Sequence, residues 1–131
     1  MATFAVVIQG APYSSQAAHS ALLFCEAVLA SGHGLQRLFF WQDGVHNASA
    51  LCTPPQDERN LPRAWQQLIS AHGIDAVVCV ASALRRGIVD AQEARRYELN
   101  ASNLLPGFVL GGLGQLVDAH QQADRLVTFA P

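Results

Sequence analysis

Short apolar runs alternate with segments of helical periodicity along most of the sequence, and this alternation limits the fold more than any other feature. Runs of strand length occur at residues 3–9, 35–41, 75–81, 108–110 and 125–129. Apolar residues recur at helical spacing in the segments 14–31, 61–72 and 113–120. This order predicts an α/β fold, a single-domain three-layer sandwich over residues 1–131 in which helices cover a mostly parallel sheet.

Capping and breaking residues mark several element boundaries. Asn60 is a good N-cap, and Pro62 follows it at an early helix position where the missing N–H of proline does little harm. Gly73 then ends that helix. Asp90, with Glu93 three residues later, predicts the start of a short polar helix. Residues 42–60 are predicted to form a long connection.

The composition fits a globular domain and excludes several mechanisms. The chain has 131 residues, of which 50% are hydrophobic and 14% charged, so one core can form. It contains no lysine, which excludes a Walker-type phosphate loop, a Schiff-base enzyme and a Ser–Lys hydrolase. A formal net charge of -2 provides no basic field for a nucleic-acid backbone, so direct nucleic-acid binding is not expected.

The expected location of the protein and the expected absence of a metal both rest on features that the sequence does not contain. The N-terminal residues carry no basic leader, and no apolar stretch approaches the roughly 20 residues of a membrane span. We therefore expect a cytoplasmic protein without membrane contact. The three cysteines agree with this compartment, because their number is odd and no CxxC motif occurs. The five histidines do not pair with cysteines at ligand spacing, so no metal is expected.

Cys79 is the candidate catalytic residue. It lies near the end of the 75–81 run, and in open parallel sheets reactive groups gather beyond the carboxyl ends of the strands. If a helix begins there, its free N–H groups favour a thiolate, and Arg85 and Arg86 add positive charge. His46, after the second strand, is a candidate base that could approach Cys79. The alternatives are a core cysteine and a surface histidine.

Other reactive or polar residues fit structural roles better. Cys25 falls on the apolar stripe of the first helix, which favours core packing. Cys52 lies in a loop with no positive charge beside it to activate the thiol. Tyr13 could donate a hydrogen bond to a ligand, although loop capping explains it better. The GGLG motif at 111–114 could hold an anion, but a tight turn and a helix start explain its spacing better.

Beyond these features, VCVASALRRGIVD at residues 78–90 closely resembles the active-cysteine segment of the DsrE/TusD sulfurtransferase subunits. The similarity includes FAVVIQGAPYSSQAAHSALLFCEAVLASGH near the N-terminus, and LFFWQDGVHNAS and TPPQDERNLPRAWQQL further along. GFVLGGLGQLVDAHQQADRLVTF resembles the C-terminal part of the family. The resemblance therefore covers nearly the whole chain and implies a DsrE/F-like fold.

This resemblance implies a sulfurtransferase in which Cys79 accepts sulfane sulfur as a persulfide. It also implies TusB/DsrH-like and TusC/DsrF-like sister subunits in a heterohexamer, a TusA-like sulfur donor and a TusE/DsrC-like acceptor. The relay would end in 2-thiouridine of transfer RNA in the Tus type, or in dissimilatory sulfur oxidation in the Dsr type. Such transfer needs a reactive and accessible thiolate but no cofactor.

Two other classes of protein stay open at this point. One is a non-catalytic structural or interaction subunit of such a complex, in which Cys79 only packs in the core. The other is a flavodoxin-like nucleotide or flavin binder, for which the GGLG motif is the only support. Reactivity of Cys79 with a thiol probe, and a chromophore in the purified protein, would separate the three classes.

Overall fold

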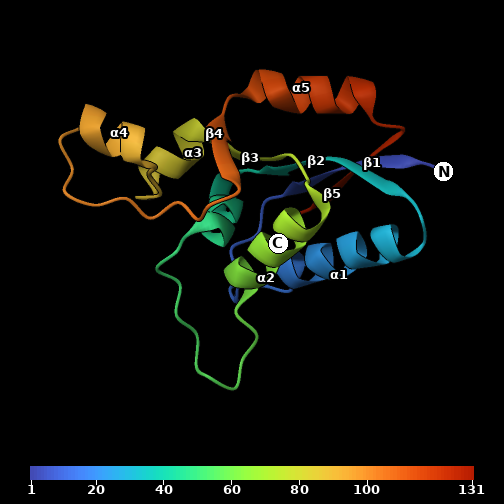
Figure 1. Ribbon diagram of the computed structural model, residues 1–131, viewed down its shortest axis with the longest axis horizontal. Coiled ribbons are helices and arrows are strands. Elements are labelled where there is room, and N and C mark those ends of the chain that lie inside the picture. The colour runs from blue at the N-terminus through green and yellow to red at the C-terminus, as the bar shows by residue number, and fades with distance from the viewer.

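In the computed structural model, which describes residues 1–131, the strands form one sheet in which every neighbouring pair is parallel (Figure 1). The strand order is β4-β3-β2-β1-β5. The strands are β1 (Thr3–Ile8), β2 (Gly34–Phe40), β3 (Ala76–Cys79), β4 (Phe108–Gly111) and β5 (Arg125–Phe129). The predicted α/β fold is confirmed, and the sheet is parallel throughout.

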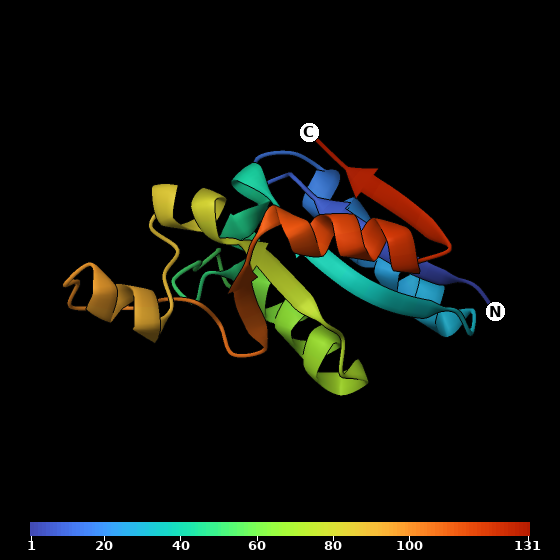
Figure 2. The same cartoon turned by 90° about the horizontal axis from the view of Figure 1, so that it is seen from above.

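Helices cover both faces of this sheet, as Figures 1 and 2 show. Two of them, α1 (Ala17–Ala30) and α2 (Leu61–His72), lie on one face, and α5 (Leu113–Gln122) lies on the other. The short helices η1 (Gln42–Ala48), α3 (Val80–Arg85) and α4 (Ala91–Arg96) gather at the end of the sheet where β2 and β3 end. None of the helices is long and apolar enough to cross a membrane.

The larger part of the core fills the space between the sheet and the pair α1 and α2. Phe40 of β2 meets Trp65 of α2 edge-on, with ring centroids 5.3 Å apart, and Phe108 packs against the same Phe40 ring. A smaller buried cluster comprises Val7, Phe39, Val77 and Cys79. Leu116 of α5 packs against this cluster. The side chain of Cys79 therefore lies on the face of the sheet that α5 covers.

The predicted helix caps are confirmed. The side chain of Asn60 accepts a hydrogen bond from the N–H of Arg63 at 3.1 Å, which caps α2. Gly73 ends α2 with a φ of 61°, in the left-handed region that favours glycine. The side chain of Asp90 accepts the N–H of Glu93 at 2.8 Å and caps α4 in the same way.

Two segments differ from the prediction. The strand β3 ends at Cys79 instead of Ala81, because α3 already begins at Val80. Residues 42–48 form the 3-10 helix η1, where only a connection was expected. This helix is fixed by the fold around it, because Gly44 packs directly on the Ile8 carbonyl and leaves no room for a Cβ atom. Buried Asn47 also donates to the Gly10 carbonyl at 3.0 Å.

Candidate active site

A hollow of about 560 Å³ lies at the carboxyl end of β3. It is lined by residues 41–43 after β2, residues 79–82 at the start of α3, residues 85–86 at the end of α3, and residues 112–113 at the start of α5. Three segments that are distant in the sequence thus meet around Cys79. A parallel sheet is expected to present reactive groups at this end of its strands.

Cys79 is both the last residue of β3 and the N-cap of α3, so it lies where the chain turns from strand to helix. It is 4% exposed and packs against the small cluster that includes Val7 and Phe39. The same residue lines the hollow. A reagent or a partner protein therefore reaches the sulfur only from the hollow.

The two predicted arginines have different surroundings. Arg86 donates through Nε to Asp43 Oδ1 at 2.8 Å and through Nη1 to the Ser82 carbonyl at 3.1 Å. Arg85 lines the hollow, is exposed and forms no ion pair. The positive charge of Arg85 is therefore uncompensated in the hollow that Cys79 also lines, whereas that of Arg86 is balanced by a carboxylate.

The wall of the hollow formed by residues 41–43 is fastened to α3. The buried Ser82 hydroxyl accepts the N–H of Gln42 at 3.1 Å, and the ion pair between Arg86 and Asp43 makes a second link. Gln42 has a φ of 51°, a left-handed conformation that a residue with a side chain adopts only when its surroundings hold it. These contacts give the hollow a defined shape on the η1 side.

The predicted base, His46, lies away from Cys79. It lines a separate hollow of about 390 Å³ together with Cys52, because η1 turns the chain between Gln42 and His46. The structure therefore does not bring His46 to the site that the sequence analysis anticipated. No group of three or more His, Cys, Asp or Glu side chains is placed to hold a metal ion.

The surroundings of Cys25 and Cys52 disfavour the thiolate form. Burial raises the pKa of Cys25 to about 12, with a smaller contribution from the charge of Glu26. Burial also raises the pKa of Cys52. Neither residue lines the hollow at Cys79. Both observations agree with the structural roles that the sequence favours for these cysteines.

Tyr13 lies beside a further hollow, of about 520 Å³, that contains no cysteine. Its hydroxyl donates to the Arg59 carbonyl at 2.6 Å and accepts the N–H of Leu61 at 2.9 Å. Desolvation by burial raises the pKa of Tyr13, so the hydroxyl stays protonated and able to donate. Tyr13 thus fastens the connection before α2, which is the loop-capping role that the sequence favours.

The GGLG motif contributes to the site in a way that the sequence analysis missed. It is a turn and a helix start, as predicted, but Gly111 is the register partner of Cys79 and Gly112 is the N-cap of α5. Two helices therefore begin beside Cys79, and the N–H groups at helix N-termini attract negative charge. Only the pairing of β3 with β4 brings the motif here, and no sequence pattern indicates that pairing.

Together, the fold and the hollow define an α/β protein with a cysteine site at the carboxyl end of a parallel strand. The model of the DsrE/DsrF-like family matches residues 2–129. The chain belongs to this family, which confirms the resemblance that residues 78–90 indicate.

Two known proteins support this assignment. A curated protein of Pseudomonas aeruginosa named "Sulfurtransferase TusD homolog" is 54% identical over 126 residues, which cover 96% of this chain and 95% of that protein. The crystal structure of the ychN protein from E. coli matches with a TM-score of 0.77 at 24% identity, over 98% of this chain and 100% of that chain. At this identity the second likeness concerns the fold alone.

Proposed function

We propose that this protein is a sulfurtransferase subunit of a sulfur relay, which accepts sulfane sulfur as a persulfide on Cys79 and passes it to an acceptor protein. The observation that carries the proposal is the position of Cys79, at a hollow where α3 and α5 both begin. The 54% identity to a protein named as a sulfurtransferase TusD homolog supports the same activity.

The proposed transfer is an exchange without net oxidation. The Cys79 thiolate attacks the outer sulfur of a donor persulfide, R–S–SH, and forms a new sulfur–sulfur bond. The bond between the two donor sulfurs breaks, and the donor leaves as the thiolate R–S⁻. Cys79 then carries the group –S–SH. An acceptor thiolate attacks that outer sulfur in turn and releases Cys79 as a thiolate.

The surroundings of Cys79 suit the charge changes of this exchange. Negative charge lies on the sulfur before the attack and again after the release, and the N-termini of α3 and α5 favour it. The unpaired charge of Arg85 acts in the same direction. We assign to Arg86 a supporting role through the wall that it forms with Asp43. His46 lines another hollow, so its position gives no support to a role as the base for Cys79. That role stays a prediction.

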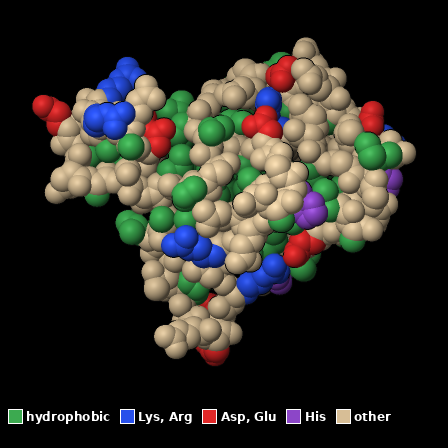
Figure 3. Space-filling model, in the orientation of Figure 1, with side chains coloured by type: hydrophobic (Ala, Val, Ile, Leu, Met, Phe, Trp, Pro, Cys, Tyr) green, Lys and Arg blue, Asp and Glu red, His purple; other side chains and the backbone are tan.

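The proposal includes partner proteins, following the resemblance to TusD-like subunits. The proposed donor is TusA-like, the proposed acceptor is TusE/DsrC-like, and the proposed sister subunits in a cytoplasmic heterohexamer are TusB/DsrH-like and TusC/DsrF-like. Large apolar side chains are exposed at several points of the surface: Leu23, Leu51, Tyr97, Leu99, Val109, Leu113 and Val117. Figure 3 shows apolar side chains spread among polar ones over the face that it views.

The proposal also concerns the final product of the sulfur relay. We place the protein in the Tus type, which ends in 2-thiouridine of transfer RNA, because the P. aeruginosa relative carries the TusD name. The Dsr type, which serves dissimilatory sulfur oxidation, is the alternative. Preferential transfer to a TusE-like acceptor supports the first type, and preferential transfer to a DsrC-like acceptor supports the second.

Cysteine variants test the sulfur-accepting step. Wild-type protein and the Cys52→Ser variant should take up sulfur from glutathione persulfide and release it to an acceptor thiol. Cys79→Ser should take up none, while its circular dichroism and melting temperature stay close to those of the wild type. Uptake by Cys79→Ser at the wild-type rate would show that another group carries the sulfur.

A non-catalytic subunit is the competing proposal. The low exposure of Cys79, 4%, and its packing in the cluster with Val7 and Phe39 favour that class. The two classes differ in one reaction of the folded protein. A carrier cysteine is alkylated under native conditions through the hollow, whereas a packing cysteine is alkylated only after unfolding.

A further inference from the structure

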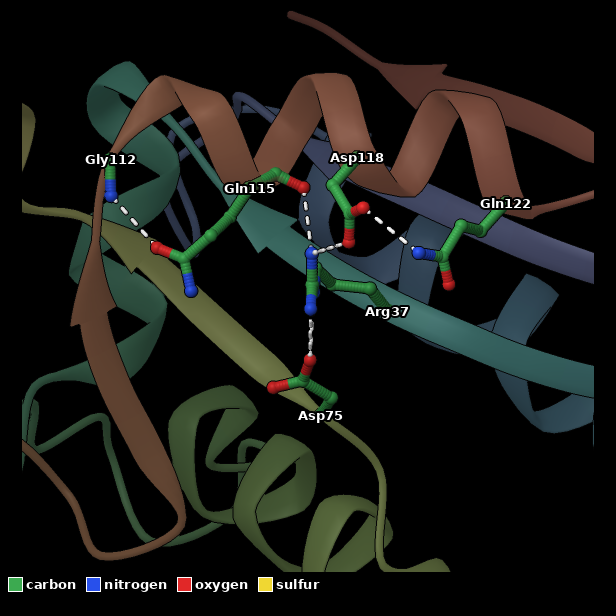
Figure 4. A network of polar contacts seen from close by, with 6 residues as sticks. All are labelled: Arg37, Asp75, Gly112, Gln115, Asp118 and Gln122. Atoms are coloured by element: carbon green, nitrogen blue, oxygen red, sulfur yellow. Dashed lines mark hydrogen bonds and ion pairs between the residues drawn. The ribbon is translucent and has the colours of Figure 1, made fainter.

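Gln115 closes the first turn of α5, next to residues 112–113 that line the Cys79 hollow. Figure 4 shows its side chain reaching back to Gly112. Its side-chain Oε1 accepts the N–H of Gly112 at 2.9 Å, and its own N–H donates to the Gly112 carbonyl at 3.1 Å. The Gln115 amide also lies on Gly111, where a Cβ atom would overlap its Oε1. One residue therefore fixes the path of the chain from Gly111 into α5.

Arg37 of β2 fastens the same turn to the sheet, and Figure 4 shows it reaching α5 on one side and Asp75 on the other. Its side chain is 13% exposed, and its Nη1 donates to the Gln115 carbonyl at 2.8 Å and lies 3.2 Å from Asp118 Oδ2. Its Nε and Nη2 both lie 2.7 Å from Asp75 Oδ2. These contacts leave the first turn of α5 little freedom to move over β2.

The fixed turn borders Cys79. Gly111 is the register partner of Cys79, and both Gly112 and Leu113 line the hollow. The N–H groups of Leu113 and Gly114 have no partner within the helix, because they belong to its first turn. The open end of α5 therefore lies at the rim of the hollow that holds the thiol.

We infer that Gln115 is a positioning residue for sulfur transfer, which sets the place of the α5 N-terminus beside Cys79 and thereby the readiness of the thiol to ionise. The inference rests on the proposed function of Cys79. Gln115 does not line the hollow, so it acts through Gly112 and Leu113. A neutral amide accepts the Gly112 bond without placing a negative charge near the thiolate, which a glutamate at this position would do.

The pH profile of Cys79 alkylation by iodoacetamide, read on the Cys79 peptide by mass spectrometry, tests this role. Gln115→Ala releases the turn, and Gln115→Glu keeps an acceptor for Gly112 but adds charge. Both variants should raise the pH midpoint by about half a unit or more. Gln115→Glu should keep a melting temperature near that of the wild type, so its shift is not an effect of unfolding.

Gln122→Ala is the matched control, because it removes the bond from Gln122 to Asp118 at 2.9 Å on the same helix, away from the hollow. Its pH midpoint should equal that of the wild type. An unchanged midpoint in Gln115→Ala, or an equal shift in Gln122→Ala, would overturn the inference, because the shift in Gln115→Glu also contains the direct effect of its added charge. Alkylation needs no sulfur donor, so a wild type that takes up no sulfur would refute the proposed function while the midpoints still decide the role of Gln115.

Discussion

Arg86 Nε lies 2.8 Å from Asp43 Oδ1, and this ion pair joins α3 to η1 at the wall of the Cys79 hollow. The neighbouring Arg85 lines the same hollow without a partner. Adjacent residues of the same type thus have different electrostatic consequences. Arg85 contributes a net positive charge at the site, whereas Arg86 and Asp43 together contribute none.

We expect Arg85→Gln to raise the pH midpoint of Cys79 alkylation, because it removes the uncompensated charge. The double variant Asp43→Asn with Arg86→Gln removes the ion pair without a change in net charge. It should leave the midpoint near the wild-type value and lower the free energy of unfolding by about 0.2–1 kcal/mol, as expected for an exposed pair. A midpoint shift in the double variant as large as that of Arg85→Gln would contradict this division of roles.

Gly44→Ala should be strongly destabilising. A Cβ atom at Gly44 would overlap the Ile8 carbonyl oxygen and lie 2.7 Å from the carbonyl carbon, and β1 is held between β2 and β5. The backbone cannot yield easily, so we expect urea unfolding to show a loss of about 1–3 kcal/mol or more. Gly114→Ala is the control, because no atom lies within 4 Å of its Cβ position. Equal stability of the two variants would be inconsistent with the packing of η1 on β1.

The buried thiol of Cys25 should make the free energy of unfolding fall as the solution becomes alkaline. The ordinary pKa of the thiol is 9.0 and burial raises it to about 12, so the folded state keeps a proton that the unfolded chain loses. The stabilisation is fully present below pH 9.0 and is lost as the pH rises toward 12. Within this window the loss approaches about 1.4 kcal/mol per pH unit.

Urea unfolding measures this contribution of Cys25 to the free energy of unfolding. The wild type and Cys25→Ala are compared at one pH below 9.0 and at one pH midway between 9.0 and 12. Cys25→Ala should be less stable at the lower pH, because a fully buried side chain is truncated, but its stability should fall less as the pH rises. Parallel pH profiles for the two proteins would show that Cys25 is not the group responsible.

The isolated chain should associate. Exposed apolar residues occur on several elements, among them Leu23 on α1, Val109 on β4 and Val117 on α5. We expect sedimentation velocity to show self-association or poor solubility of the chain alone, and a defined assembly after co-expression with TusB-like and TusC-like subunits. A monomer at all concentrations that does not bind these subunits would contradict the proposed quaternary structure. It would not bear on the proposed chemistry at Cys79.

Local signals in the sequence predicted much of the fold. The caps Asn60 and Asp90 and the terminator Gly73 make contacts within a few residues, so their roles can be read from neighbouring positions. The alternation of apolar runs and helical segments predicted the parallel sheet, because a βα repeat favours parallel pairing. Cys79 was identified by its place near the end of one run and by the similarity of residues 78–90 to a known family.

The rest of the site depends on contacts between distant segments. The pairing of β3 with β4 brings Gly112 near Cys79, although Cys79 and its register partner Gly111 are 32 positions apart in the sequence. The helix η1 depends on packing against Ile8, and its turn carries His46 away from the hollow. Arg37 lies in an apolar run, and only the tertiary structure shows that it binds Asp75 before β3 and both Gln115 and Asp118 of α5. Periodicity and motif spacing contain no information on such contacts.

Mass spectrometry of the wild-type protein after incubation with a persulfide donor tests the central claim most directly. The protein is digested after blocking of free thiols, and the peptides that contain Cys25, Cys52 and Cys79 are compared. The account predicts a gain of one sulfur atom on the Cys79 peptide, which an acceptor thiol removes. Sulfur found only on the Cys25 or Cys52 peptide, or on no peptide while the donor remains active, would contradict the account.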